Sequence, residues 1–254
     1  MSVDESANSR LLRFMGPEKL ARLTHARVMV FGLGGVGSNC VESLVRGGVG
    51  SFVLIDGDEV ELSNLNRQAI ALRSTIGMRK VDATEKLVHA INPQANVATI
   101  DRFLSGEDVA PIFDEWAEKV DFVIDALDTL DVKLQIALEA QGRNIPIVSA
   151  MGAGNKLDPM RLQFADLYKT DVCPLSKAMR KRGRKLGLKH LRVIYSDEPP
   201  MEPKPADGES SGQRAVLGTT SYMPPIMGQM IASDCIRQIA GLENPNAKVR
   251  GYRA

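Results

Sequence analysis

Four glycines and an aspartate carry the clearest chemical signal in this sequence. Gly32, Gly34 and Gly37 follow the spacing G-x-G-x-x-G with Gly35 inside it, and Asp56 comes nineteen positions after Gly37. Glycines permit a tight turn and a close approach of backbone to phosphate, while an aspartate after the next strand can accept ribose hydroxyls. The pattern is typical of a βαβ unit that binds a mononucleotide or dinucleotide. The alternative is a tight strand-to-helix turn without a ligand.

The elements expected to position these residues alternate between strand and helix through residue 150. Short apolar runs predict strands at residues 28–31, 52–55, 97–100, 120–124 and 145–150, and helical spacing predicts helices at residues 78–91, 107–118 and 132–141. Such alternation predicts an α/β fold with a Rossmann-like, doubly wound, mostly parallel sheet. Gly32, Asp56 and the segment 125–128 fall at carboxyl ends of strands, so we expect them to meet in one pocket.

The second half follows a looser pattern. We expect strands at residues 162–165 and 191–195, a basic helix at residues 174–186 and an apolar helix at residues 225–240. The predicted organisation is a nucleotide-binding, Rossmann-like core at residues 1–150 and an α+β extension at residues 151–254 that completes the same domain. Residues 197–214 are rich in proline, glycine, serine and acid, which predicts a mobile loop.

Composition limits the function classes. The chain has 254 residues, 44% of them hydrophobic and 25% charged, and a net charge of +1. Bulk charge therefore predicts neither a nucleic-acid nor a membrane partner, and no stretch approaches the roughly 18 apolar residues of a membrane span. The three cysteines, Cys40, Cys173 and Cys235, form no CxxC pair, which fits a reducing compartment. With a polar, acidic start that is no signal peptide, we expect a cytoplasmic protein without a membrane partner.

Five separated motifs together resemble one superfamily. They are GLGGVGS, LIDGDEVELSNLNRQ, a lysine after Gly-Met-Arg, INP at residues 91–93 and DALDT at residues 125–129. In this order they resemble the adenylyltransferases related to ubiquitin-activating enzymes, which include the activators of sulfur-carrier proteins. Residues 150–170, a PL-x-K turn and the basic helix most resemble the branch of tRNA threonylcarbamoyladenosine dehydratases.

The resemblance implies an ATP site at the glycine turn. The four glycines would cradle the phosphates, and Asp56 would accept the ribose hydroxyls. Asn64 and Arg67 would grip the triphosphate, Lys80 would neutralise it, and Asp128 would hold Mg²⁺. The alternative for Arg67 and Lys80 is an ordinary surface ion pair.

Three further site assignments are less direct. Asp58 is kept as a nucleotide-binding candidate, although for Asp58 and Glu59 we favour solvated turn acids. Asp125 and Asp128 are ambiguous by pattern alone, and we prefer Asp128 as the Mg²⁺ ligand. In related dimers an arginine near the N-terminus reaches the neighbouring subunit's nucleotide, and Arg13 is the candidate here.

Sulfur-carrier activators usually hold a structural zinc through two CxxC pairs, which this chain lacks. This departure argues against a sulfur-carrier role. The resemblance further implies a homodimer, and it leaves open a monovalent cation at the turn 152–158 and a cysteine desulfurase or sulfur-acceptor partner.

The segment 177–192 concentrates nine basic residues in sixteen positions. A run of this kind is often a solvated helix face. Since the net charge is only +1, however, the cations are segregated, and a local positive patch is what RNA phosphates require. We therefore predict tRNA binding by Arg180, Lys181, Arg182, Arg184 and Lys185.

The predicted function is an ATP-dependent dehydration of N6-threonylcarbamoyladenosine in tRNA. Adenylation of the free carboxylate would be followed by ring closure within the same substituent, which needs no enzyme nucleophile. Cys173 is accordingly expected to be a buried or loop cysteine rather than a reactive thiol. The alternatives are adenylation of the C-terminal glycine of a ubiquitin-like sulfur carrier, an NAD-dependent oxidoreductase and a non-catalytic nucleotide-binding scaffold.

Overall fold

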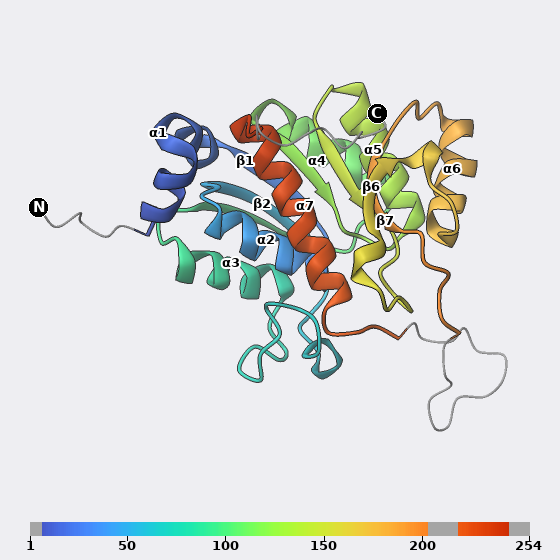
Figure 1. The fold of residues 1–254 in the computed structure, drawn as a ribbon, viewed down its shortest axis with the longest axis horizontal. Coiled ribbons are helices and arrows are strands. Elements are labelled where there is room, and N and C mark those ends of the chain that lie inside the picture. Colours follow the sequence, from blue (N-terminus) through green and yellow to red (C-terminus); the bar gives the residue numbers. More distant parts are fainter. Residues whose placement is uncertain (1–6, 203–217, 244–254) are drawn as a thin grey trace, which may run out of the picture.

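The computed structural model describes residues 7–202 and 218–243, and a seven-stranded sheet lies at its centre (Figure 1). The strands are β1 (Arg27–Phe31), β2 (Ser51–Asp56), β3 (Asn96–Asp101), β4 (Phe122–Asp125), β5 (Ile147–Ala150), β6 (Leu162–Asp166) and β7 (Arg192–Ser196). Their order across the sheet is β3-β2-β1-β4-β5-β7-β6. Neighbouring strands are parallel except β6, which is antiparallel to β7. The predicted α/β fold is confirmed.

Helices cover both faces of the sheet. They are α1 (Ser9–His25), α2 (Gly37–Arg46), α3 (Lys80–Ile91), α4 (Val109–Trp116), α5 (Leu130–Gly142), α6 (Pro174–Leu186) and α7 (Met223–Ala240). Helices α2, α3 and α7 share one face, whereas α4, α5 and α6 share the other. Because helices cover both faces of the sheet, the central strands are almost continuously apolar.

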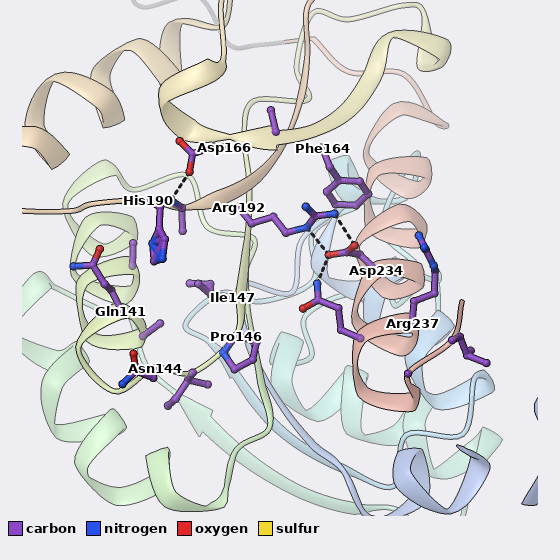
Figure 2. A pocket seen from close by; sticks show the side chains of 18 of the residues that line it. Gln141, Asn144, Pro146, Ile147, Phe164, Asp166, His190, Arg192, Asp234 and Arg237 are labelled. Atoms are coloured by element: carbon purple, nitrogen blue, oxygen red, sulfur yellow. Dashed lines mark hydrogen bonds and ion pairs between the residues drawn. The ribbon is translucent and has the colours of Figure 1, made fainter. Parts of the chain in front are cut away.

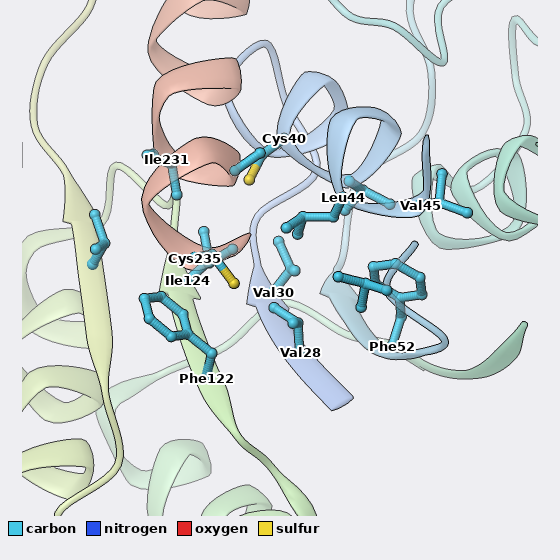
Figure 3. Close-up of a cluster of buried hydrophobic side chains, with 14 of the residues drawn as sticks. Val28, Val30, Cys40, Leu44, Val45, Phe52, Phe122, Ile124, Ile231 and Cys235 are labelled. Atoms are coloured by element: carbon cyan, nitrogen blue, oxygen red, sulfur yellow. The ribbon is translucent and has the colours of Figure 1, made fainter. Parts of the chain in front are cut away.

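Strand β1 contributes side chains to the cores on both sides of the sheet. Val28 and Val30 pack into the core beneath α2 and α7, and Met29 and Phe31 pack into the core beneath α4 and α5. This follows from the period of two along a strand. Figure 3 shows Val28 and Val30 facing the side chains of α2 and α7.

The C-terminal extension joins the same sheet and core. Strands β6 and β7 extend the sheet beyond β5, and α7 packs closely against α2 (Figure 1). Gly228 permits this close packing, because a Cβ there would lie 2.3 Å from the carbonyl oxygen of Val36. The expected apolar helix at residues 225–240 is therefore part of the core.

Two predicted helices are shorter than expected. The helix expected from residue 78 begins at Lys80, because Arg79 has an extended backbone and forms a β-bridge with Glu59. The helix expected at residues 107–118 is helical only over Val109–Trp116, with 3₁₀ turns at Gly106–Asp108 and Ala117–Lys119. Of the predicted loop 197–214, residues 197–202 contain neither helix nor strand, and the remainder lies outside the described residues.

Candidate functional site

The candidate site lies at the carboxyl edge of the three central strands. Phe31 of β1 pairs with Ile55 of β2 and with Asp125 of β4, so the three strands end together. The backbone N–H of Gly32 donates to the carbonyl of Ile55, and that of Ala126 donates to the carbonyl of Phe31. The turns that follow β1, β2 and β4 are thereby brought side by side, as the sequence predicts.

Packing accounts for three of the four glycines in the first turn. Gly32 has a φ of +87°, and a Cβ on Gly37 would lie 1.8 Å from the carbonyl oxygen of Gly32. A Cβ on Gly35 would lie 2.8 Å from the Cβ of Pro224 at the start of α7. These positions exclude side chains because the turn and the helix packing leave no room for them.

Gly34 differs from its neighbours. Its φ is not in the left-handed region, and a Cβ there would meet only the amide nitrogen of Gln68, at 3.9 Å. Nothing in the fold excludes a side chain here, so the bare backbone forms an open cradle. Such a cradle fits the approach of a phosphate to backbone N–H groups.

Asp56 ends β2 and is tied to the glycine turn. One carboxylate oxygen accepts from the N–H of Leu33 at 2.6 Å, and the other accepts from the N–H of Asp58 at 2.8 Å. The residue is 8% exposed. These bonds hold a carboxylate beside the turn, and each oxygen keeps a lone pair with which it can accept a hydroxyl.

Arg67 lies over the glycine turn from the segment after β2. A Cβ on Gly35 would lie 3.2 Å from the Cγ of this arginine. Its guanidinium donates to the carbonyl of Ser63 at 3.0 Å and to the side chain of Asn66 at 2.9 Å. Both acceptors are neutral, and within residues 7–202 and 218–243 no carboxylate pairs with this arginine. Asn64 is buried and accepts from the N–H of Glu61, which shapes the turn that carries Arg67.

Lys80 and Asp58 form an ion pair with an Nζ–Oδ2 distance of 2.6 Å. The lysine side chain is 8% exposed and that of the aspartate 50% exposed. Asp58 is thus exposed in a turn, as expected of a solvated turn acid, and it also pairs with the buried end of Lys80. Glu59 is also paired, with Arg79 at 3.5 Å.

The structure separates Asp125 from Asp128. Asp125 is fully buried, whereas Asp128 is exposed in the turn after β4. One oxygen of Asp125 accepts from the ammonium of Lys133 at 2.8 Å and from the hydroxyl of Ser149 at 2.5 Å. The carboxylate of Asp125 is thus buried and bound to Lys133 and Ser149. Asp128 is the carboxylate at this turn that a ligand can reach.

This buried ion pair was not predicted from the sequence. Lys133 has no exposed surface, and its ammonium also donates to the carbonyl of Ala150 at 2.9 Å. The signal was a lysine within the apolar stripe of α5, between Val132 and Leu134. Because a buried charge needs a partner, that position could have been paired with an acid at a strand end.

Arg13 does not reach the site within one chain. It is exposed on α1, before a break at Gly16. Helix α1 packs beside Gly48, which follows the C-terminal end of α2. The glycine turn is at the opposite, N-terminal end of α2. Any role of Arg13 at a nucleotide would therefore require a second subunit.

The basic helix forms with the predicted bounds, and three of its five candidates are engaged within the chain. Arg180 donates to Thr170, Arg182 pairs with Asp131, and Arg184 lies over the ring of Tyr168 at 5.1 Å. Lys181 and Lys185 are exposed, and no ion pair involves them in the part of the chain that the structure describes. The two lysines are therefore the candidates whose charge is most available to a partner.

Donors of the chain itself contact the turn 152–158, for which the resemblance left a monovalent cation open. The carbonyl oxygens of Asn155 and Leu157 already accept from the N–H of Met201 and the hydroxyl of Tyr222. The buried ammonium of Lys156 donates to the carbonyl of Glu198, which faces the same turn. The chain's own donors thus engage these oxygens.

A separate cavity of about 850 Å³ opens near the starts of β5 and β7, away from the glycine turn (Figure 2). Arg192 and Asp234 form a two-bond ion pair across it, with both N–O distances at 2.8 Å. Phe164 stacks beneath the guanidinium at 4.8 Å. The cavity was not predicted from the sequence, because its residues come from four separated segments.

The sequence of the chain matches one protein family over nearly its whole length. The sequence profile described as the ThiF family matches residues 6–254. The chain belongs to the ThiF family. A tRNA threonylcarbamoyladenosine dehydratase of Bacillus subtilis (strain 168) is 39% identical over 229 residues, which cover 90% of this chain and 87% of that relative.

Solved structures give a matching result. The E. coli tRNA N6-threonylcarbamoyladenosine dehydratase TcdA in complex with AMP superposes with a TM-score of 0.81 at 30% identity, covering 91% of this chain and 92% of that one. The same E. coli protein in complex with ATP gives a TM-score of 0.80 at 28% identity, with the same coverage. The likeness extends through both halves of this ThiF-family chain. Within its described ranges, no helix has the length and apolar character needed to cross a membrane.

Proposed function

We propose that this chain is an ATP-dependent tRNA threonylcarbamoyladenosine dehydratase. The observation that carries the proposal is the 39% identity to a dehydratase across 90% of the chain, because it includes the extension as well as the nucleotide-binding half. The site geometry supplies the chemistry. A glycine cradle, a ribose-type carboxylate, two cations and an exposed aspartate share one edge of the sheet.

ATP is the proposed cosubstrate. Its phosphates would lie on the backbone at Gly34, and its ribose hydroxyls would reach Asp56. Arg67 and Lys80 would face the triphosphate from two other turns. Asp58 would act through Lys80, since it holds that ammonium at 2.6 Å.

Asp128 is the proposed protein ligand of Mg²⁺. Magnesium commonly takes one or two carboxylates and completes its shell with phosphate oxygens and water. A single exposed aspartate beside the phosphate cradle fits that coordination preference. When bound, the ion would neutralise charge on the departing pyrophosphate.

The first step is adenylation of the substrate carboxylate. A carboxylate oxygen bonds to the α-phosphorus while the bond from that phosphorus to the bridging oxygen breaks, and pyrophosphate leaves. Negative charge develops on the phosphate oxygens in this step. The fixed cations Arg67 and Lys80 would stabilise it most in a site with little water.

The second step closes a ring within the substituent. A ureido oxygen or nitrogen of the threonylcarbamoyl group bonds to the activated carbonyl carbon, AMP leaves, and a proton is lost from the ureido group. The product is a five-membered ring, and the tRNA has lost one water. Intramolecular attack has a high effective molarity, so no enzyme nucleophile is required.

The tRNA is proposed to contact α6 through Lys181 and Lys185, with the three arginines of that helix nearby. A cytoplasmic homodimer, with Arg13 acting at the partner's nucleotide, and a link to a cysteine desulfurase or sulfur acceptor are further proposals from the family resemblance. A monovalent cation is not proposed, because a buried ammonium lies at the turn 152–158 and the chain's own donors engage the carbonyls of Asn155, Leu157 and Glu198 there.

The test is a nucleoside mass spectrum of tRNA carrying threonylcarbamoyladenosine, taken before and after incubation with the protein, ATP and Mg²⁺. We expect the loss of one water. Arg67→Ala should slow it by about 10²–10³-fold, as expected for removal of a fixed transition-state donor. Arg46→Ala is the matched control, since Arg46 is an exposed arginine on α2. An unchanged spectrum, with pyrophosphate exchange only after a sulfur-carrier protein is added, would instead favour the carrier-activating alternative.

A further inference from the structure

Lys156 is an ammonium buried at the carboxyl edge of the sheet. The residue is 4% exposed, and its Nζ donates to the backbone carbonyl of Glu198. The carboxylate of Glu198 does not take this contact, because it accepts from the N–H groups of Leu157 and Asp158 at 3.0 Å each. A charged ammonium is thus held inside the turn by a carbonyl oxygen.

Burial lowers the pKa of Lys156, because the ammonium loses hydration. The charges of Glu198 and Asp197 oppose that effect, as does Cys173 when it is ionised, and the charge of Arg161 adds to it. Glu198, Asp197 and Arg161 are the charged groups that face the ammonium from neighbouring segments, and Cys173 is the titratable thiol beside them. Burying an ammonium costs free energy, so an ammonium kept in this position is expected to stabilise the structure around it.

The turn around Lys156 joins two other segments. The carbonyl of Asn155 accepts from the N–H of Met201 at 2.8 Å, and the N–H of Asn155 donates to the carbonyl of Gly218 at 2.8 Å. The hydroxyl of Tyr222 donates to the carbonyl of Leu157 at 2.9 Å. Residues 152–158 are therefore tied both to the segment after β7 and to the segment before α7.

The same segments border the candidate site. The side chain of Asn66 donates to the carbonyl of Thr219 at 3.3 Å, and Pro224 lies against Gly35. Asn66 in turn accepts from Arg67 at 2.9 Å. The position of the turn thus bears on the wall of the site next to Arg67.

We propose that the ammonium of Lys156 is the internal cation of this turn, and that it holds residues 152–158 in place without a bound monovalent ion. A metal ion at this point would need several free oxygen ligands. Three carbonyl oxygens at this turn, those of Glu198, Asn155 and Leu157, already accept from Lys156, Met201 and Tyr222. This proposal rests on the contacts of the turn and does not depend on the reaction that the enzyme catalyses.

The first test is thermal unfolding of the full chain in NaCl, KCl and choline chloride at equal ionic strength. The wild type should have the same midpoint in all three salts. A midpoint higher in Na⁺ or K⁺ than in choline would overturn the proposal, because it would reveal an ion that binds the folded state. This arm needs no variant, so it remains decisive even if substitutions of Lys156 fail to fold.

Two variants test the charge itself. Lys156→Met keeps the length of the side chain and should lower the midpoint by roughly 2–10 °C, since it leaves a buried carbonyl without its donor. Lys156→Ala should fall similarly and regain part of the loss in ammonium or potassium chloride, but not in choline chloride. Lys189→Met, at an exposed lysine, is the control and should not move the midpoint. A Lys156→Met midpoint equal to that of the wild type, or a Lys156→Ala midpoint that no small cation raises, would refute an internal cation.

Discussion

The ion pair between Lys133 and Asp125 is expected to be a main determinant of stability at the site. Both side chains have no exposed surface, and the ammonium contacts Asp125 at 2.8 Å and the carbonyl of Ala150 at 2.9 Å. Replacement of Lys133 by methionine keeps the shape but leaves the carboxylate buried without a counter-charge. Removing one partner of such a pair typically costs about 3–5 kcal/mol. The hydroxyl of Ser149 remains at 2.5 Å, so we expect the lower half of that range.

Urea unfolding followed by far-UV circular dichroism measures this loss. The double variant Asp125→Asn with Lys133→Met removes both charges and should be more stable than Lys133→Met alone, because no ion is left uncompensated. Arg46→Met is the control. The Arg46–Glu42 pair has side chains 59% and 31% exposed, and pairs of this kind contribute about 0–1 kcal/mol.

A Lys133→Met loss below about 1 kcal/mol, or a double variant less stable than the single one, would refute this role of the pair. The pair also bears on function, because the other oxygen of Asp125 accepts from the N–H of Leu127 at 3.2 Å, next to Asp128. If this bond positions the turn, a folded Asp125→Ala, Lys133→Met variant, which lacks the acceptor, should need more Mg²⁺ for half-maximal pyrophosphate exchange than the Asp125→Asn, Lys133→Met variant. A purely structural pair would leave that requirement unchanged.

Three other predictions concern the cradle, the basic helix and the thiols. Gly34→Ala should fold normally but bind ATP at least about 10-fold more weakly in a calorimetric titration, since only a ligand needs the open backbone there, whereas Gly37→Ala should fail to fold. Lys181→Ala with Lys185→Ala should reduce the slope of log affinity for tRNA against log salt by about 1.5, with ATP-dependent adenylation unchanged; an unaltered slope would place the tRNA elsewhere. Cys173→Ser should retain dehydration activity in the mass-spectrometric assay, and an inactive but folded variant would point to a covalent thiol intermediate.

Local sequence was sufficient to predict the turn after β1 and the edge of the sheet at which the candidate residues meet. The turn after β1 is determined by steric contacts between neighbouring residues, such as Gly37 against the carbonyl of Gly32. Period-two and helical patterns then place the strand ends at one edge. The bounds of α6 were equally predictable, because Pro174 begins the helix and Gly187 ends it in the left-handed region.

Pairings between distant segments could not be predicted in the same way. Lys133 meets Asp125 only because α5 folds back across β4, and Ser149 joins them from the next strand. The start of α3 was misplaced because Arg79 bridges to Glu59 across a long turn. Such contacts depend on tertiary packing, which overrides local propensity.

The placement of the cysteines bears on the choice between intramolecular ring closure and a covalent enzyme intermediate. Cys40 and Cys235 lie in the core between α2 and α7 (Figure 3), and burial raises the pKa of both thiols. Cys173 is 2% exposed in a different core, beneath α6. A thiolate is the nucleophilic form of cysteine, and the raised pKa values of Cys40 and Cys235 keep those two thiols neutral. Formation of a thioester at any of these positions would require part of a core to open, whereas the substrate's own ureido group already lies a few bonds from the activated carbonyl. The described fold therefore favours ring closure by the substrate itself.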